Sequence, residues 1–340
     1  MISRIAKPIN QIMINDTIQW GILAPGAIAH KFTRDLRVAK GGKLRAVAGR
    51  DLGRAKAFAD EFGAEKATDD LMELAADDSV DIVYIASPHN FHFAAAKALL
   101  EAGKPVLCEK PLTLNAAQAR ELIGISRANN VFFMEAMWTR CLPIYDRVRE
   151  WLDDGRIGEP RLVTSHFCFP SPYDPTSRWF DPELAGGSLL DLGVYNLAVS
   201  QFVMGRKPDK VAAVARFSGS GVDEMLSASL LYENGGMAQF TCGLTSRFDN
   251  SLVIGGEKGF IRVAPRFMDA EEAALTIGNH TETVREPLRG EGFEFEIEEA
   301  MRCLRAGEIE SPKMPLDDTL ATMEVMDEVR ARIGLRYPGE

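Results

Sequence analysis

Between residues 17 and 135, apolar runs of strand length alternate with segments of helical spacing. The runs expected to form strands are Ile18–Leu23, Lys43–Gly49, Asp81–Ala86, Val106–Cys108 and Asn130–Glu135. Helical spacing is found in His30–Ala39, Phe93–Ala102 and Leu114–Arg127. Strands that alternate with helices in this way indicate a doubly wound parallel sheet with helices on both faces. The pattern predicts an α/β fold with an N-terminal Rossmann domain.

The pattern changes near residue 140, and a chain of 340 residues exceeds one ordinary hydrophobic core. A helix is expected at Pro143–Asp154, after which strands follow one another without regular helices. The candidate strands are Arg161–Phe169, Lys210–Ser218, Met225–Tyr232, Met237–Thr245, Ser251–Gly255, Phe260–Ala264 and Ala274–Ile277. We therefore expect residues 17–140 to form the Rossmann domain and residues 141–340 an α+β domain with a large, mainly antiparallel open sheet.

The region from Ala238 to Thr245 alternates between apolar and small or polar residues with a period of two. This alternation is typical of a sheet with one covered face and one lighter face. Such a face often meets a second copy of itself. We expect a homodimer or homotetramer that assembles through the C-terminal sheet.

Charge and cysteine usage exclude several functional classes. The net charge of −10 argues against a nucleic-acid-binding surface, and no apolar run reaches the roughly 18 residues of a membrane span. The five cysteines have no C-x-x-C spacing, which suits the reducing cytoplasm better than a disulfide framework or a zinc site. Residues 1–16 lack the apolar core of a secretion signal and are interpreted as a mobile extension.

The turn after the first expected strand resembles a dinucleotide fingerprint. It reads Ala24-Pro25-Gly26-Ala27-Ile28-Ala29 and leads into the first helix. Gly26 would let a pyrophosphate approach the N–H groups at the helix start, so we predict nucleotide contacts from Ala24, Gly26, Ala27 and Ile28. Ala24 replaces the first glycine of the pattern, and a plain strand–helix turn remains the alternative.

The second expected strand ends at Arg50 and Asp51, where a Rossmann fold meets the adenosine ribose. An acidic residue there binds the 2′-hydroxyl of NAD, whereas arginine binds the 2′-phosphate of NADP. Arg54 lies one helical turn beyond Arg50, so two guanidinium groups could converge on one phosphate. We therefore predict NADP, with NAD possible. The alternative is that these three residues are solvated charges at a helix start.

Further polar residues follow the later strands of the predicted parallel sheet. Glu109, Lys110 and Pro111 end the strand that begins at Val106, and Ser87-Pro88-His89-Asn90-Phe91-His92 follows the strand before it. The carboxyl ends of parallel strands are where open α/β sheets bind ligands. We include Ser87, Pro88, His89, His92, Glu109 and Lys110 among the predicted nucleotide contacts. A surface ion pair and packing histidines are the alternatives, and no carboxylate cluster or H-E-x-x-H spacing indicates a metal.

A second chemical segment, residues 177–197, lies between the first two strands of the C-terminal domain. Gly186-Gly187-Ser188 would permit close backbone approach to a ligand. Asp191 and Tyr195 are four residues apart, so both side chains can reach one point on a helical face. A phenol needs help to carry a proton near neutral pH, and the ammonium of Lys110 would lower its pKa and hold it by a hydrogen bond. The alternative is an ordinary half-buried tyrosine bonded to Asp191.

The Gly21–Gly26 turn, the Glu109-Lys110-Pro111 motif and the Gly186-Gly187…Asp191…Tyr195 segment together resemble the Gfo/Idh/MocA oxidoreductase family. The resemblance extends from Ile18 to Pro338. More narrowly, Arg50–Ala55, Val106–Pro111, Met134–Arg140 and Leu189–Tyr195 resemble the dimeric dihydrodiol dehydrogenases and NADP-dependent D-xylose dehydrogenases. Many members of the wider family carry histidine where this chain has Tyr195.

The resemblance implies a set of roles for these residues. Lys110 would bond the reacting hydroxyl, Tyr195 would carry its proton, Glu109 would fix Lys110, and Asp191 would bond substrate or orient Tyr195. Trp138 would contact both the cofactor and the substrate. The candidates for the substrate pocket are Trp138, Arg178, Trp179 and Phe180, for each of which core packing is an equal alternative.

The resulting hypothesis is an NADP-dependent dehydrogenase that acts on a secondary or anomeric hydroxyl of a sugar or cyclic diol. A D-xylose-like aldose and a trans-dihydrodiol are the expected substrate types. Two alternatives come from other functional classes, namely a glycosidase that uses the redox chemistry of bound NAD and a non-enzymatic nucleotide-binding regulator. The combined presence of Lys110, Asp191 and Tyr195 weakens the regulator alternative. A hydrolase would not accumulate reduced nucleotide when given a sugar and excess NADP⁺.

Overall fold

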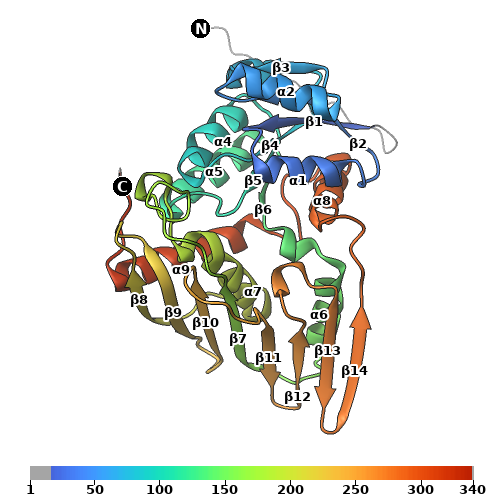
Figure 1. Ribbon diagram of the computed structural model, residues 1–340. Helices are drawn as coiled ribbons and strands as arrows, with labels where there is room; N and C mark the ends of the chain where they lie inside the picture. Colours follow the sequence, from blue (N-terminus) through green and yellow to red (C-terminus); the bar gives the residue numbers. More distant parts are fainter. Residues whose placement is uncertain (1–16, 339–340) are drawn as a thin grey trace.

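A computed structural model describes residues 17–338, which form two β-sheets joined by helices (Figure 1). The N-terminal sheet and its helices occupy the upper part of Figure 1, and the second sheet lies below them. The extension predicted at residues 1–16 lies outside the described residues. Among residues 17–338, no helix has both the length and the apolar composition needed to cross a membrane.

The first sheet has six parallel strands in the order β3-β2-β1-β4-β5-β6. The strands are β1 (Ile18–Leu23), β2 (Gly42–Ala48), β3 (Lys66–Thr68), β4 (Ile82–Ile85), β5 (Val106–Glu109) and β6 (Phe133–Ala136). Its helices are α1 (Ala27–Leu36), α2 (Leu52–Phe62), α3 (Leu71–Ala76), α4 (His92–Glu101) and α5 (Ala116–Asn129). The predicted Rossmann sheet is therefore confirmed. The strand order reverses at β1, whose neighbours are β2 and β4, so the ligand crevice is expected at its carboxyl end.

Local side-chain caps explain where several of these helices begin. The carboxylate of Asp51 accepts the N–H of Arg54 at the start of α2, and the amide of Asn115 accepts that of Gln118 at the start of α5. The first helix starts at Ala27, earlier than the expected His30, because Gly26 is already its N-cap residue. Sequence reasoning missed the short elements β3 and α3.

The second sheet has eight strands in the order β14-β13-β12-β11-β7-β10-β9-β8. They are β7 (Pro160–Cys168), β8 (Lys210–Phe217), β9 (Asp223–Leu231), β10 (Met237–Gly243), β11 (Leu252–Gly256), β12 (Gly259–Val263), β13 (Glu272–Ile277) and β14 (His280–Arg285). Only β7 and β10 pair in parallel; the other neighbours are antiparallel, as predicted. The edge strand β14 was not predicted.

Four further α-helices follow β6 in the described part of the chain. They are α6 (Pro143–Asp153), α7 (Val194–Met204), α8 (Phe293–Ala306) and α9 (Leu316–Ile333). Every residue of α7 is buried, because it packs against the sheet on one side and α9 on the other. Two helices late in the chain return to the first sheet: α8 packs against α1, and α9 packs against α5 (Figure 1). The two sheets are thus connected by α8 and α9 as well as by the chain segment that runs from β6 to β7.

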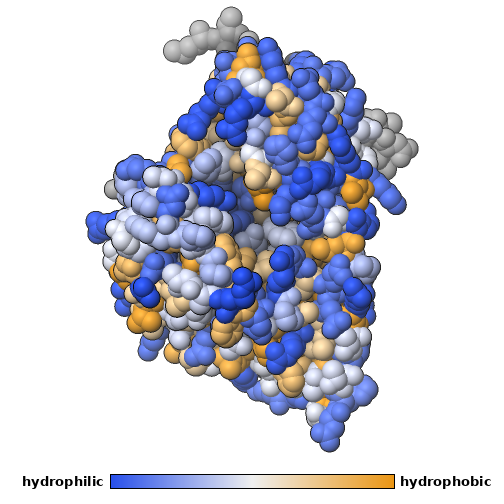
Figure 2. All heavy atoms as spheres, viewed as in Figure 1, coloured by the Kyte–Doolittle hydropathy of each residue, from blue (hydrophilic) through white to orange (hydrophobic). Residues whose placement is uncertain are grey.

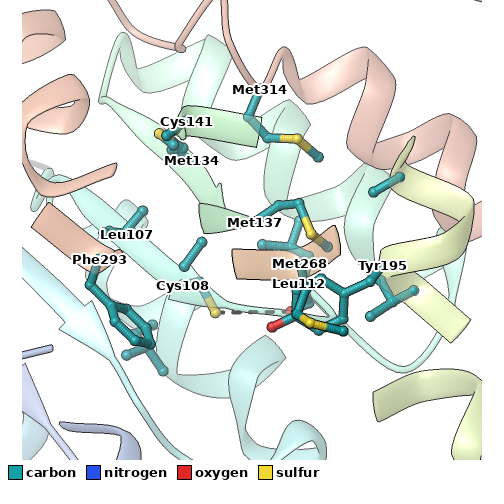
Figure 3. Close-up of a cluster of buried hydrophobic side chains, with 14 of the residues drawn as sticks. Leu107, Cys108, Leu112, Met134, Met137, Cys141, Tyr195, Met268, Phe293 and Met314 are labelled. Carbon is teal, nitrogen blue, oxygen red and sulfur yellow. Dashed lines mark hydrogen bonds between the residues drawn. The ribbon is translucent and has the colours of Figure 1, made fainter. Parts of the chain in front are cut away.

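An apolar cluster fills the junction between the two sheets. Figure 3 shows Leu112, Met137, Met268 and Tyr195 gathered at one end of this cluster, with Phe293 at the other. All of these residues except Met268, which is 5 % exposed, and Tyr195, at 6 %, are at most 3 % exposed. The phenol ring therefore lies against a rigid apolar surface. Figure 2 shows a hollow on the molecular surface between the upper and lower parts of the molecule.

Candidate active site

Lys110 follows the last residue of β5 and reaches across to the C-terminal domain. Its ammonium donates to Asp191 Oδ1 at 2.8 Å and to the backbone carbonyl of Asp191 at 2.9 Å. The two side chains are only 11 % and 5 % exposed. β5 is buried throughout, which fixes the position of the loop that begins at Lys110. The ion pair joins two residues that are 81 positions apart in the chain. The structure thus brings Lys110 and Asp191 together as a buried ion pair.

Asp191 is the centre of the charged cluster. Besides Lys110, it accepts a hydrogen bond from Arg178 at 2.7 Å, and His89 Nε2 lies 3.9 Å from its carboxylate. Burial alone would raise the pKa of Asp191, but Lys110 and Arg178 outweigh burial and lower the pKa far below its usual value. Asp191 lies in a π-helical turn over Leu189–Gly193 rather than in the expected α-helical geometry. This wider turn often occurs at functional sites.

Tyr195 lies beside Lys110, but the contact differs from the expected one. The Lys110 ammonium is 4.9 Å from the centroid of the phenol ring and donates to Asp191 instead of the phenol oxygen. The phenol oxygen accepts a 2.8 Å hydrogen bond from Trp138 Nε1. Burial, reinforced by the charge of Glu109, raises the pKa of Tyr195 well above its usual value. The expectation of a lowered pKa is therefore wrong for this arrangement, because burial outweighs the nearby cation.

Trp138 is held by an aromatic stack that sequence reasoning missed. Its ring is parallel to that of Phe293, with centroids 5.0 Å apart and an interplanar angle of 7°. Phe293 is the first residue of α8. The Gly-Phe pair that precedes a helical pattern at residues 292–293 was visible in the sequence, but nothing local connected it to Trp138, 155 positions earlier.

Glu109 fixes the backbone of Lys110 rather than its ammonium. One carboxylate oxygen accepts from the hydroxyl of Tyr84, and the other accepts the Lys110 N–H at 3.3 Å. Burial raises the pKa of Glu109. Glu135, which sequence reasoning did not single out, fixes the same loop two residues after Lys110. Its carboxylate accepts the N–H of Leu112 at 3.0 Å. Burial raises the pKa of Glu135 to about 7.

The two histidines after β4 differ in role. His92 bridges two backbone carbonyls, with Nδ1 2.9 Å from Pro111 O and Nε2 2.8 Å from Ser87 O. It therefore fixes the loop after β5 to the loop after β4. Burial lowers the pKa of His89 to about 3, so its imidazole is neutral at physiological pH. Among the described residues, the buried atoms Ser87 Oγ and His89 Nδ1 have no hydrogen-bond partner, and Pro88 lies between them.

The turn between β1 and α1 has the geometry of an anion site. Ala24 has a φ of 68°, a left-handed conformation that usually requires glycine and costs an alanine about 1 kcal/mol. The first intrahelical bond of this turn is that of His30 N–H to Gly26 O. The earlier N–H groups of Ala27 and Ile28 thus belong to the open first turn of a ten-residue helix. This donor set suits a pyrophosphate.

Three charged residues follow β2, and only the carboxylate among them has a structural role in a helix cap. Asp51 Oδ1 accepts the Arg54 N–H at 3.0 Å, so Asp51 serves as the cap of α2. The guanidinium of Arg50 lies 5.2 Å from the centroid of the Phe91 ring. Between residues 17 and 338, no carboxylate forms an ion pair with Arg50 or Arg54, and both side chains are exposed. The cations therefore fit a phosphate-bearing nucleotide.

Two expectations for residues 177–188 are corrected by the structure. Phe180 is only 1 % exposed and packs edge-on against Tyr173, so it belongs to the core rather than to a pocket wall. The close approach at Gly186 and Gly187 is to the chain itself: added Cβ atoms there would lie 2.8 Å from Trp179 O and 2.2 Å from Asp223 Oδ1. The two glycines thus shape the turn before Asp191. Trp179 is half-buried beneath the guanidinium of Arg178, 4.4 Å from its ring.

Acidic and sulfur groups do not converge into a metal site anywhere in residues 17–338, where no group of three or more His, Cys, Asp or Glu is suitably placed.

Comparison with protein families gives two matches. Residues 18–137 match the model described as an oxidoreductase family with an NAD-binding Rossmann fold, and residues 145–262 match the GFO/IDH/MocA C-terminal domain. Over 332 residues the chain is 36 % identical to trans-1,2-dihydrobenzene-1,2-diol dehydrogenase of Mus musculus, covering 94 % of this chain and 98 % of the relative. The Homo sapiens enzyme of the same name is 35 % identical over 331 residues, with the same coverage of both chains.

Solved structures show the same architecture. A 3-ketoreductase from Actinomadura kijaniata, in complex with NADP and TDP-benzene, is 27 % identical with a TM-score of 0.83, covering 94 % of this chain and 98 % of that one. An aldose–aldose oxidoreductase from Caulobacter crescentus shares the fold at 22 % identity and a TM-score of 0.85, covering 93 % and 97 %. Both sheets and the helices between them therefore have counterparts in one known architecture.

Proposed function

The chain belongs to the Gfo/Idh/MocA family of NAD(P)-binding oxidoreductases, and from that premise we propose that it is an NADP-dependent dehydrogenase acting on CH–OH groups. Its substrate would be a cyclic trans-dihydrodiol or a D-xylose-like aldose. The observation that carries the proposal is the placement of a buried Lys110–Asp191 ion pair against the ring of Tyr195. The dehydrogenases named above, 35–36 % identical over nearly the whole chain, support the diol-type substrate.

In this proposal residues 17–140 bind the nucleotide. The open first turn of α1, with Gly26, Ala27 and Ile28, would hold the pyrophosphate, and Arg50 with Arg54 the 2′-phosphate. The loop after β4, in which the buried atoms Ser87 Oγ and His89 Nδ1 have no hydrogen-bond partner among the described residues, would face the nicotinamide half of the nucleotide. Bound NADP⁺ would supply the acceptor for a hydride from the substrate carbon.

Residues 141–340 would hold the substrate against this nucleotide. The ammonium of Lys110, oriented by Asp191, would donate to the reacting oxygen, and the phenol of Tyr195 would exchange a proton with it. Burial disfavours the phenolate form of Tyr195, so the positive charge of Lys110 is needed to stabilise that form. Trp138 would orient the phenol through its 2.8 Å hydrogen bond.

The exposed side of the cluster would bind the rest of the substrate. Arg178 is 53 % exposed yet bonded to Asp191, so its free donors can reach a second hydroxyl. The ring of Trp179 lies beneath Arg178 and offers an apolar face. A ring-shaped substrate with two neighbouring hydroxyls would use both contacts.

The test is a screen of aldoses, cyclitols and dihydrodiols with each nucleotide, monitored by near-ultraviolet absorbance of the reduced form. The wild type should reduce NADP⁺ with one of these classes, and Tyr195→Phe should lower kcat about 10²- to 10⁴-fold while leaving nucleotide affinity unchanged. Turnover of Tyr195→Phe at the wild-type rate would refute the proposed proton carrier.

The preference for NADP has its own test. Arg50→Ala should weaken NADP⁺ binding more than NAD⁺ binding, because only NADP⁺ carries the 2′-phosphate. Asp51→Asn is the neighbouring control, since its amide oxygen still caps α2. Equal weakening of both nucleotides by Arg50→Ala would contradict the role of Arg50.

Two further parts of the proposal concern assembly and compartment. A second copy of the chain would cover the outer face of the eight-stranded sheet, giving a homodimer or a homotetramer. The protein would act in the cytoplasm, because all five cysteines, which lie within the described residues, are free thiols and buried. The assembly is tested in the Discussion.

A further inference from the structure

The loop before α8 is held by two buried carboxyl groups from different parts of the chain. Asp35, near the end of α1, accepts the N–H groups of Glu291 at 2.8 Å and Phe293 at 2.9 Å. Glu294, in the first turn of α8, accepts those of Arg289 at 2.7 Å, Gly290 at 3.0 Å and Gly292 at 2.8 Å. Every backbone N–H from residue 289 to residue 293 is thereby donated to one of these two side chains.

The loop lies so close to its neighbours that only glycine fits at two positions. A Cβ atom on Gly290 would lie 2.3 Å from Asp35 Oδ1. A Cβ atom on Gly292, whose φ is +105°, would lie 2.6 Å from Cζ3 of Trp138. The backbone at residues 290–292 therefore fills the space between the Asp35 carboxyl and the Trp138 indole, and displacement of one would move the other.

A continuous set of contacts connects this loop to Tyr195. Asp35 fixes the N–H of Phe293, the Phe293 ring stacks on Trp138, and Trp138 Nε1 donates to the phenol oxygen. Asp35 and Glu294 touch neither Lys110 nor Tyr195 directly. Their effect on the site must pass through the position of Trp138.

We propose that Asp35 and Glu294 form a two-carboxyl clamp that positions Trp138 and through it the hydroxyl of Tyr195. Both are positioning residues. The inference about Tyr195 rests on the proposed function, whereas the inference about Trp138 stands without it. A clamp between α1 and α8 would also link the nucleotide-binding turn at the start of α1 to the phenol.

The protonation of the clamp follows from its surroundings. Burial, with the adjoining Glu294 carboxyl, raises the pKa of Asp35 to about 6. For Glu294 burial acts in the same direction, but the hydrogen bonds from the loop, Arg289 first, outweigh it and lower its pKa. The charged groups that face the pair from the loop and from α8 are Arg289, Glu291 and Glu296, and Glu291 is itself paired with Lys31 and Arg34 of α1.

The directions of the two pKa shifts determine how the stability of the clamp depends on pH. Since the pKa of Asp35 is raised on folding, its stabilising contribution is complete below the unfolded value of 3.8 and is lost as the pH rises through about 6. The contribution of Glu294 has the opposite dependence and is lost as the pH falls through its lowered value. The clamp should therefore be tightest while it holds one proton and should loosen above about pH 6.

The test compares Asp35→Ala, Asp35→Asn and the control Glu298→Gln. Asparagine keeps an acceptor for the loop and can donate to Glu294, so it imitates the protonated clamp. Glu298 is on the same helix and pairs with Arg289 of the same loop, but it takes no part in the clamp. The emission of Trp138, obtained by subtracting the spectrum of Trp138→Phe in each background, is measured between pH 5 and pH 8 with kcat and the NADP⁺ dissociation constant.

In the wild type and Glu298→Gln, the Trp138 emission should change with a midpoint near pH 6. Asp35→Asn should lack that transition and keep the low-pH spectrum. Asp35→Ala should shift the spectrum at every pH and lower kcat about 100-fold with the NADP⁺ dissociation constant unchanged, because misplacing a reacting group by about 1 Å has this effect.

The clamp is refuted if Asp35→Ala leaves the Trp138 emission unchanged, or if Asp35→Asn keeps the transition near pH 6. Failure of the proposed function looks different, since Tyr195→Phe would then retain turnover while the Trp138 spectrum still responded to Asp35. If Asp35→Ala does not fold, the comparison of Asp35→Asn with Glu298→Gln still decides the matter.

Discussion

At the scale of single residues, the central feature is one buried carboxylate between two cations. Asp191 bonds Lys110 at 2.8 Å and Arg178 at 2.7 Å, and the three charges sum to +1. This arrangement pairs the ammonium of Lys110 with an ionised carboxylate in a poorly solvated place. It also orients Lys110, since the ammonium bonds two oxygens of the same residue.

Asp191→Asn should therefore lower the rate. Without the carboxylate, Lys110 and Arg178 repel each other, and the ammonium of Lys110 loses the charged acceptor that orients it. We expect kcat/KM to fall at least tenfold at pH 8, measured by NADPH formation.

The same substitution should lower the free energy of unfolding by about 3 kcal/mol in urea, because it leaves a buried cation unpaired. Glu150→Gln is the control, since Glu150 pairs with Arg147 on an exposed helical turn and should change stability by less than about 1 kcal/mol. An unchanged kcat/KM in Asp191→Asn would show that Lys110 does not depend on Asp191 for its orientation.

At the scale of elements, the sequence predicted most strands of both sheets and the residues at their carboxyl ends. Periodicity located β5 and therefore Lys110, and cap residues such as Asn115 located helix starts. The missed contacts depend on distant packing. The stack of Phe293 on Trp138 has no local signal in the sequence. The same is true of the hydrogen bonds between Asp35 and the loop before α8. The expectation of a lowered pKa for Tyr195 was wrong, because the burial of a side chain cannot be inferred from its residue type alone.

The two ends of α8 provide a matched pair of substitutions. Gly292 at its start and Gly307 at its end both have positive φ, so alanine should be strained at either by about 1 kcal/mol. Only at Gly292 would the new Cβ press on Trp138, since nothing lies within 4 Å at Gly307. Gly292→Ala should therefore lower kcat at least tenfold in the NADPH assay, whereas Gly307→Ala should only lower the melting temperature. Equal kcat values in the two variants would show that the start of α8 does not influence the active site.

At the scale of the whole molecule, the outer face of the eight-stranded sheet is nearly free of charge across its middle strands. The register brings Val214, Ser227, Thr241 and His166 into one row across β8, β9, β10 and β7. Val214 is 73 % exposed although it is apolar. Stable interfaces bury about 800 Å² on each partner, an area that a sheet face can supply. A second copy of the same face would meet it with matching small side chains.

Val214→Lys should convert the assembly to monomers, because each protomer would place an ammonium in a shared face that is nearly free of charge. The molar mass from light scattering during gel filtration should fall to that of one 37.4 kDa chain. Met72→Lys is the matched control: Met72 is 52 % exposed on α3, away from this sheet, and its replacement should leave the mass of the assembly unchanged. Since α7, which carries Tyr195, packs against the covered face of the sheet, the monomer should keep its affinity for NADP⁺. An unchanged mass for Val214→Lys would place the contact between copies on another surface.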